Sequence, residues 1–236
     1  LSFDTTLRGG FTEYSNTLDD RAQGAISVLD GNNKYAPFNI TVSSGATCFI
    51  ERVKFCRSAT RNILKAGSGN LSMVNCIVSD CDKSMQGSGI YLSGGVNTFD
   101  SCEFMNLKHA VGDYHQAGAA MYVAGANKVI LENCKFEGNG AFVAQNHRDA
   151  PGGSAIYSAN APIIASGCRF VGNVERTEKH NDFRSAGCVT VNGNCGGSAF
   201  TNCLWLGNCG TYSDASKVGT STNSAAVVVS LSSASS

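Results

Sequence analysis

Short apolar stretches, separated by glycine, asparagine and other polar residues, recur along this chain from about residue 39 onwards. Within a stretch, apolar and polar residues alternate, as in Cys134-Lys135-Phe136-Glu137. This is the period of two expected of a strand with one buried face. The stretches are rich in β-branched and aromatic residues, which favours strands. No window has the apolar stripe of an amphipathic helix, so the pattern predicts an all-β chain almost without helix.

One stretch belongs to a repeated motif. Residues 132–139 (ENCKFEGN) return in altered form at 166–173 and 201–208, and weaker copies lie further upstream. The first apolar anchors of the six copies are residues 53, 76, 102, 134, 168 and 203, so the steps between them are 23, 26, 32, 34 and 35 residues. Self-similarity with this period indicates a solenoid in which each repeat is one structural unit.

A second motif accompanies the first. It reads GSGIYL at 87–92, GAAMYV at 118–123 and GSAIYS at 153–158. From its first large apolar residue to the next anchor the distance is 12 to 14 residues. From an anchor to the following copy of the second motif, the distance varies from 10 to 24 residues. The variation in repeat length therefore falls in one connection.

A third short strand, such as 128–131, lies between the two motifs. Three short strands per repeat are typical of one coil of a parallel β-helix, and we predict the right-handed form because parallel crossovers are nearly always right-handed. About six to seven coils fit the chain. Residues 1–38 carry the repeat poorly and are predicted to be an N-terminal cap with the first strands leading into the solenoid. Residues 39–236 are predicted to form the β-helix, a C-terminal strand and a serine-rich tail.

Coils stacked in register would place equivalent side chains about 4.8 Å apart, one per coil. We therefore predict three ladders: an internal cysteine ladder, an aromatic ladder beside it, and an asparagine ladder at a corner where the backbone enters the left-handed region. The predicted members are Cys76, Cys102, Cys134, Cys168 and Cys203; Phe55, Val78, Phe104, Phe136, Phe170 and Trp205; and Asn139, Asn173 and Asn208.

The chain contains 11 cysteines, and the sequence leaves two interpretations of them open. Inward-facing ladder cysteines are expected to stay reduced and to act as small hydrophobic residues. Stacked coils nevertheless bring Cα atoms within the range of a disulfide. The better disulfide candidates lie near corners, namely Cys56, Cys81, Cys195 and Cys209. So many cysteines favour an oxidising compartment, and an odd count leaves at least one thiol without an intrachain partner.

The net charge gives little information about function, because 18 basic residues balance 18 acidic ones. Bulk electrostatics therefore does not indicate nucleic acid or an anionic membrane as a partner, and no apolar run is long enough to predict a membrane span. Asn39-Ile40-Thr41 and Asn70-Leu71-Ser72 match the glycosylation acceptor pattern, which makes Asn39 and Asn70 candidates. An extracellular or cell-surface location is expected.

The variable connections are the candidate binding surface. They span about 82–87, 107–117, 140–152, 174–185 and 210–223, and stacking of the coils should place them on one face of the solenoid. All four histidines and many charged residues lie in them. The candidate binding residues are His109, Asp113, His115, His147, Arg148, Asp149, Glu178, His180 and Asp182.

A carbohydrate-active enzyme, such as a polysaccharide lyase, a glycoside hydrolase or a tailspike-like protein, is the alternative function. Glycoside hydrolysis needs two carboxylates, and Asp113, Asp149 and Asp182 are available in successive connections. The segments expected of a polygalacturonase-like enzyme are missing, and aromatic residues for sugar stacking are scarce in the connections. His109 and His115 have no second pair of ligands at fixed spacing, so no metal site is predicted. No cofactor is predicted.

The motifs Phe136-Glu137-Gly138-Asn139 and Phe170-Val171-Gly172-Asn173, with 152–156 (GGSAI), resemble the paired Phe-x-x-Asn and Gly-Gly-Ala-Ile signature of polymorphic outer-membrane-protein repeats. The resemblance covers roughly residues 50–230. It implies a surface-exposed or secreted passenger with adhesive or structural work. We therefore expect a non-enzymatic subunit of a surface fibre or sheath, or an adhesive module. Its partners would be proteins, glycans, or further copies that join through the ends of the β-helix.

Overall fold

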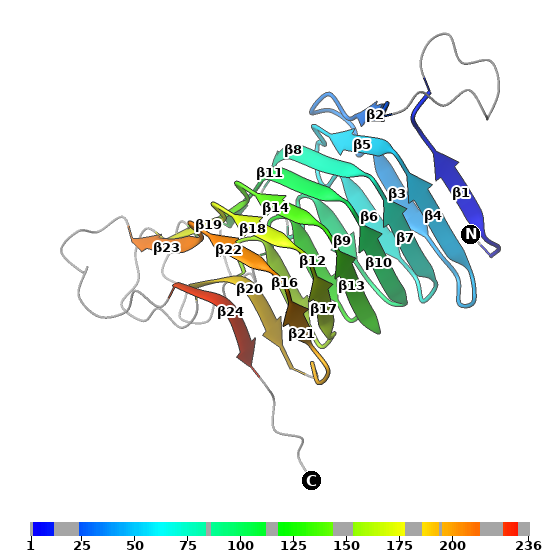
Figure 1. The fold of residues 1–236 in the computed structure, drawn as a ribbon. Helices are drawn as coiled ribbons and strands as arrows, with labels where there is room; N and C mark the ends of the chain where they lie inside the picture. Colours follow the sequence, from blue (N-terminus) through cyan, green and yellow to red (C-terminus); the bar gives the residue numbers. More distant parts are fainter. Residues whose placement is uncertain are drawn as a thin grey trace.

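The computed structural model describes residues 2–11, 24–83, 86–111, 118–143, 153–177, 186–193, 195–212 and 224–230. These residues form 24 strands and no helix, and the strands lie in three parallel sheets around a common core (Figure 1). The chain visits the three sheets in turn and then returns to the first sheet one level further along. The architecture is the right-handed parallel β-helix that the repeat predicts, with seven coils in the described part of the chain.

Each coil contributes one strand to the main path of each sheet, and the second sheet has three further strands described below. The first sheet contains β1 (Thr5–Arg8), β4 (Thr47–Glu51), β7 (Asn70–Val74), β10 (Val96–Asp100), β13 (Lys128–Glu132), β17 (Ile163–Ser166) and β21 (Ala199–Thr201). The second contains β2 (Ser27–Asp30), β5 (Val53–Cys56), β8 (Ile77–Lys83), β11 (Glu103–Val111), β14 (Lys135–Glu137), β18 (Arg169–Val171) and β22 (Leu204–Leu206). The third contains β3 (Phe38–Thr41), β6 (Ile63–Ala66), β9 (Ile90–Leu92), β12 (Met121–Ala124), β16 (Ile156–Ala159), β20 (Ala186–Asn192) and β24 (Ser224–Ser230).

The register of the strands produces three continuous apolar columns through the core, one from each sheet. The first-sheet column is Leu7, Ile50, Met73, Phe99, Leu131, Ala165 and Phe200. The second-sheet column is Leu29, Phe55, Val78, Phe104, Phe136, Phe170 and Trp205. The third-sheet column is Phe38, Ile63, Ile90, Met121, Ile156, Val189 and Val227. The interior members of these columns are buried and together form one core. The period-two alternation of the strands places them there.

Two corners of every coil from the second onwards are formed by a residue with positive φ. The corner before the second-sheet strand has Arg52, Asn75, Ser101, Asn133, Gly167 and Asn202, and the corner after it has Arg57, Asp80, Asn106, Gly138, Gly172 and Gly207. The two corners of a coil are always five residues apart. The segment between the corners is therefore constant in length, and all insertions occur elsewhere.

From the third coil onwards a fourth stretch of strand, which the sequence did not predict, follows the second of these corners. In the later coils it is a separate strand: β15 (Gly140–Val143), β19 (Val174–Thr177) and β23 (Cys209–Tyr212). In the earlier coils β8 and β11 continue through the corner and supply it, so β11 pairs with both β14 and β15. These strands form an arm of the second sheet that projects from the triangular core (Figure 1).

The N-terminal residues were predicted to be a cap with leading strands. Strands β1 and β2 pair with β4 and β5 in the same parallel register that later coils use. With β3 they complete a first coil, so the solenoid begins before residue 38. Thr5–Arg8 carries a single inward apolar residue, Leu7, and lacks both repeat motifs, which is why the sequence pattern did not identify it.

Candidate functional site

The predicted binding residues were assigned to the connection that follows the Phe-x-x-Asn corner. His109 is the exception to that placement, because it lies within β11 and its side chain is only 2% exposed. The expected connection 107–117 therefore starts as strand, and His109 is not a surface ligand. Asp113, His115, His147, Arg148, Asp149, Glu178, His180 and Asp182 lie outside the described residues.

The predicted cysteine ladder exists. Cys76, Cys102, Cys134 and Cys168 are fully buried, and Cys203 in the last coil is half-buried. The Sγ of each of these five cysteines lies within hydrogen-bond distance of two carbonyl oxygens, one two residues before it and one in the preceding coil, and its single S–H can serve either; Cys134 Sγ, for example, lies 3.3 Å from both Glu132 O and Phe99 O. The ladder thus satisfies backbone acceptors between coils.

The prediction of disulfides is not supported. The ten cysteines whose side chains the structure describes are free thiols, including Cys56, Cys81 and Cys195, and the Cys209 side chain lies outside that set. Burial raises the pKa of Cys81 to about 11 and that of Cys188 still higher. Burial thus accounts for these described cysteines without disulfides.

The aromatic ladder is continuous over the last four coils. Phe104 and Phe136 are stacked with centroids 4.7 Å apart, Phe136 and Phe170 with centroids 4.9 Å apart, and Phe170 and Trp205 with centroids 4.2 Å apart. The interplanar angles are 4°, 7° and 5°, so the rings are nearly parallel. Parallel stacking follows from the register, since the rings occupy equivalent positions in successive coils.

The hydrogen bonds of the asparagine ladder are confirmed, but the asparagines themselves do not adopt the left-handed conformation. Asn173 Nδ2 donates to Phe136 O (2.9 Å) and Asn208 Nδ2 to Phe170 O (2.8 Å), so each side chain reaches back to the preceding coil. The left-handed residue is the preceding glycine, for example Gly172 with φ 60°. The glycine makes the turn, and the asparagine that follows it points inward.

The two glycosylation candidates differ in exposure. Asn39 lies in β3 with an exposed side chain. Asn70 lies at the start of β7, is half-buried, and accepts a hydrogen bond from the Val96 backbone N–H at 2.9 Å. Asn39 is therefore the more accessible of the two acceptor sites.

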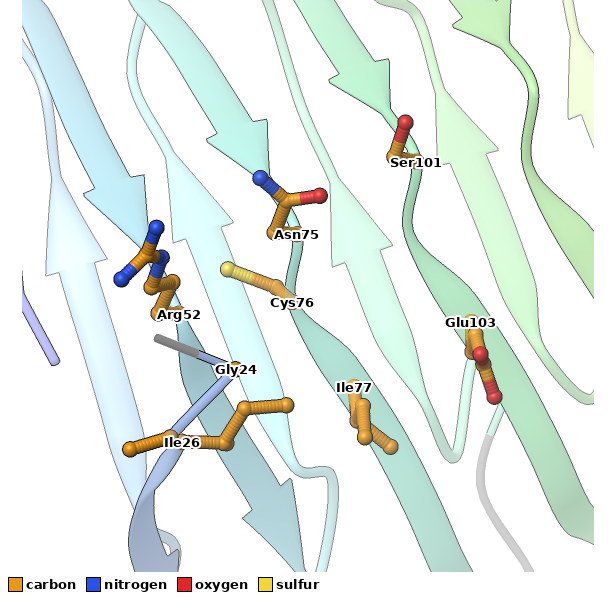
Figure 2. Close-up of a pocket in the computed structure, with 9 residues that line it drawn as sticks. Gly24, Ile26, Arg52, Asn75, Cys76, Ile77, Ser101 and Glu103 are labelled. Carbon is orange, nitrogen blue, oxygen red and sulfur yellow. The ribbon is translucent and has the colours of Figure 1, made fainter. Parts of the chain in front are cut away.

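A hollow of about 320 Å³ lies on the outer surface at the corner between the first and second sheets. Arg52, Asn75 and Ser101, which follow the ends of β4, β7 and β10, stand in a row along it (Figure 2). Gly24 and Ile26 flank the Arg52 side, and Glu103 flanks the Ser101 side. The row exists because these three residues form the same left-handed corner in successive coils.

The chemistry of the hollow suits binding. Arg52 brings a guanidinium that is paired with Glu51 at 3.8 Å, and Asn75 and Ser101 bring an amide and a hydroxyl. Glu103 is the single carboxylate among its lining residues. The lining therefore lacks the two carboxylates that glycoside hydrolysis uses. It offers hydrogen-bond donors and acceptors to a polar ligand.

The two ends of the solenoid form a second kind of site. The three core columns end in Leu7, Leu29 and Phe38 at one end and in Phe200, Trp205 and Val227 at the other, and all six are only partly buried. In the described part of the chain, the outer edges of β1, β2 and β3 and of β21, β22 and β24 pair with no further strand. The ends expose apolar side chains and backbone hydrogen-bonding groups together.

Neither a metal site nor a membrane helix was found within the described ranges. No group of three or more His, Cys, Asp or Glu side chains there could hold a metal ion. No helix in the same ranges is long and apolar enough to cross a membrane.

Comparison with protein-family models matches residues 15–229 to a family described as a right-handed β-helix region. Searches of curated proteins and of solved structures gave no match. The match covers most of the chain, and it agrees with the three parallel sheets and the seven-coil register. The chain belongs to the right-handed β-helix family.

Proposed function

We propose that this chain is a non-enzymatic structural subunit of an extracellular surface assembly, in which copies stack end to end through their terminal coils. The open core at both ends supports this proposal. The partly buried Phe200, Trp205 and Val227 belong to the same three columns as Leu7, Leu29 and Phe38. A second copy placed at the end would therefore continue each column into its own first coil.

The outer face of the second sheet also supports a second copy of the chain as the partner at each end. One outward column there runs through Val28, Lys54, Ile77, Glu103, Lys135, Arg169 and Leu204. Four of its five interior members are charged, whereas the two terminal members are apolar and exposed, Val28 at 56% and Leu204 at 45%. End-to-end stacking would bring Leu204 of one copy beside Val28 of the next and remove both from water.

Lateral binding is the second part of the proposal. The hollow at Arg52, Asn75 and Ser101 lies along the side of the solenoid, so it stays accessible when the ends are covered. A protein or glycan partner would bind there or on the variable connections. The surface location itself rests on the resemblance to surface-protein repeats.

The test is the mass of the chain in solution as a function of concentration, by sedimentation velocity with negative-stain microscopy alongside. Stacking predicts reversible growth into short rods. Leu204→Glu places a carboxylate at the proposed joint and should shift the equilibrium to the monomer without unfolding the chain. Lys135→Glu, in the same column but an interior coil, is the matched control and should assemble like the wild type.

A chain that stays monomeric at every concentration would exclude the stacking. Rods that persist equally in Leu204→Glu would place the joint elsewhere. In either case the hollow becomes the primary site, and binding to a glycan panel is the next measurement.

A further inference from the structure

Lys65 is a core residue of the third sheet. Its column runs through Ile40, Lys65, Leu92 and Val123, so its neighbours above and below are apolar. The side chain of Lys65 is fully buried. A buried ammonium is unfavourable unless polar groups replace its water.

Four backbone carbonyl oxygens surround the Lys65 ammonium. Nζ lies 2.9 Å from Gly67 O and 2.5 Å from Gly69 O in the turn that leads to β7. It lies 2.9 Å from Ser93 O and 2.9 Å from Gly94 O in the equivalent turn one coil further. Three N–H donors thus serve four acceptors, and one cation joins two successive turns.

No carboxylate takes part in this arrangement. Among the residues that the structure describes, no Asp or Glu lies within ion-pair distance of Lys65. Four carbonyl dipoles therefore replace part of the hydration that the ammonium loses on burial. Of the four carbonyls, Gly94 O also accepts from Asn97 Nδ2 at 3.1 Å.

Glycines hold the two turns close enough to build the cage. Gly67, Gly94 and Gly95 have φ of 84°, 68° and 67°. A Cβ on Gly95 would lie 1.8 Å from Gly69 O and 3.2 Å from Lys65 Nζ. A side chain at this position would displace the carbonyl that makes the shortest contact with Nζ.

We propose that the turns 66–69 and 93–95 form a receptor for a primary ammonium group, which Lys65 fills from within the chain. The receptor binds the ammonium head through its N–H donors and charge. The methylene groups of the side chain only position the ammonium group. A free primary alkylammonium ion of matching length should therefore occupy the site when the lysine side chain is shortened.

Lys65→Ala removes three methylene carbons and the nitrogen, which together equal n-propylammonium. The experiment compares the thermal unfolding of wild type, Lys65→Ala and the control Lys128→Ala, whose lysine is only half-buried. Each is measured with n-propylammonium chloride, with tetramethylammonium chloride at equal ionic strength, and with n-propanol. Tetramethylammonium has charge but no N–H, and propanol has the stem but no charge.

We expect Lys65→Ala to unfold roughly 5–15 °C below wild type, given about 2–4 °C per kcal/mol for a chain of this size. Propylammonium should restore at least half of that loss in a saturable way, and the other two additives should not. The wild type and Lys128→Ala should respond to the two salts alike. Equal rescue by propanol, or an Lys65→Ala variant as stable as wild type, would overturn the proposal.

A second measurement covers the case in which Lys65→Ala does not fold. Nitrogen-15 NMR of the wild type should show one lysine NH₃⁺ group with slow proton exchange near neutral pH, assigned through its absence in Lys65→Met. If all lysine NH₃⁺ signals exchange at the rate of free lysine, the ammonium is not held by the carbonyls and the proposal fails.

Discussion

Asn139 and Asn173 are joined twice, because Asn173 Oδ1 accepts both the Asn139 backbone N–H at 3.1 Å and the Asn139 side-chain amide at 2.9 Å. Asn173 in turn gives its own N–H and its amide to Asn208 Oδ1, at 3.0 and 2.8 Å. The amides form a chain of hydrogen bonds that runs along the solenoid axis and bonds successive coils to one another.

Asn173→Ala should destabilise the fold by about 2–4 kcal/mol, because it leaves Phe136 O and two Asn139 donors without their partner in a buried place. Urea unfolding followed by circular dichroism measures this change. Asn208→Ala, in the half-buried last coil, is the control with a smaller loss. Equal losses at the two positions would contradict the idea that burial sets the contribution of each rung.

Phe136→Ala should cost about 3–5 kcal/mol, since it opens a cavity between two stacked rings in the interior of the column. Phe136→Leu should cost no more than about 1.5 kcal/mol, because most of the volume is retained. Tyr35→Ala, where the ring is 71% exposed, should change stability little. The same unfolding assay serves all three variants, and a Leu variant as unstable as the Ala variant would mean that ring stacking rather than volume dominates.

Because Asp30 and Arg57 form an ion pair, we expect the protein to lose the stability contributed by Asp30 in acid. The Arg57 guanidinium, followed by the Asn32 backbone N–H, lowers the pKa of Asp30 below its ordinary 3.8. A carboxyl with a lowered folded pKa contributes stability above its unfolded pKa, and that contribution disappears as pH falls through the folded value. The difference in stability between wild type and Asp30→Asn should therefore be constant near neutrality and shrink below about pH 4. A difference that stays constant through this range would show that the pair is not formed.

The burial of Lys65 implies a second pH dependence, of the same sign but in the alkaline range. Burial lowers the pKa of Lys65 to about 8, whereas an unfolded lysine titrates near 10.4. Between these values the unfolded chain binds more protons than the native chain, so native stability should rise with pH. The measurement is urea unfolding of wild type and Lys65→Met across this window, where only the difference between them reports Lys65. Parallel curves would mean that the lysine pKa is unchanged on folding.

Thiol reactivity tests the reduced state of the ladder. Cys76, Cys102 and Cys134 are fully buried, so a thiol reagent at mildly alkaline pH should label them only after denaturant is added. Cys203, half-buried in the terminal coil, should be labelled in the native protein. Peptide mass spectrometry locates the label. Fewer thiols in the denatured protein without reductant than with it would reveal disulfides, whereas the ten described cysteines are free thiols.

Sequence alone was sufficient for the fold class and the ladders, because the stacked residues recur within fixed motifs. Phe136, Phe170 and Trp205 could be aligned by their distance from the cysteine anchor, and that alignment is the observed register. Residues 1–38 were predicted only as a cap with leading strands, because Leu7 and Leu29 lie in strands without either motif and their place in the core columns could not be derived from the repeat.

The site was much less predictable than the fold. His109 was read as a loop residue because it lies in the connection 107–117, where repeat length varies, yet pairing with β8 and β15 extends the strand through it. The hollow joins Arg52, Asn75 and Ser101, three different residue types that no motif connects. The Lys65 cage consists of backbone carbonyls, so no pattern of side chains could reveal it.

The constant five-residue separation of the two left-handed corners gives each coil one side of fixed length and one side whose length varies. Adding a single residue between Asn133 and Gly138 would reverse which side chains face inward, and Phe136 would be turned to solvent. Foreign peptides should instead be accepted between β15 and β16, or at the same point of other coils, where natural repeat lengths already differ. Peptides grafted there in successive coils would be displayed as a row with a spacing of about 4.8 Å. The chain could therefore serve as a scaffold that presents several copies of a peptide at a fixed spacing.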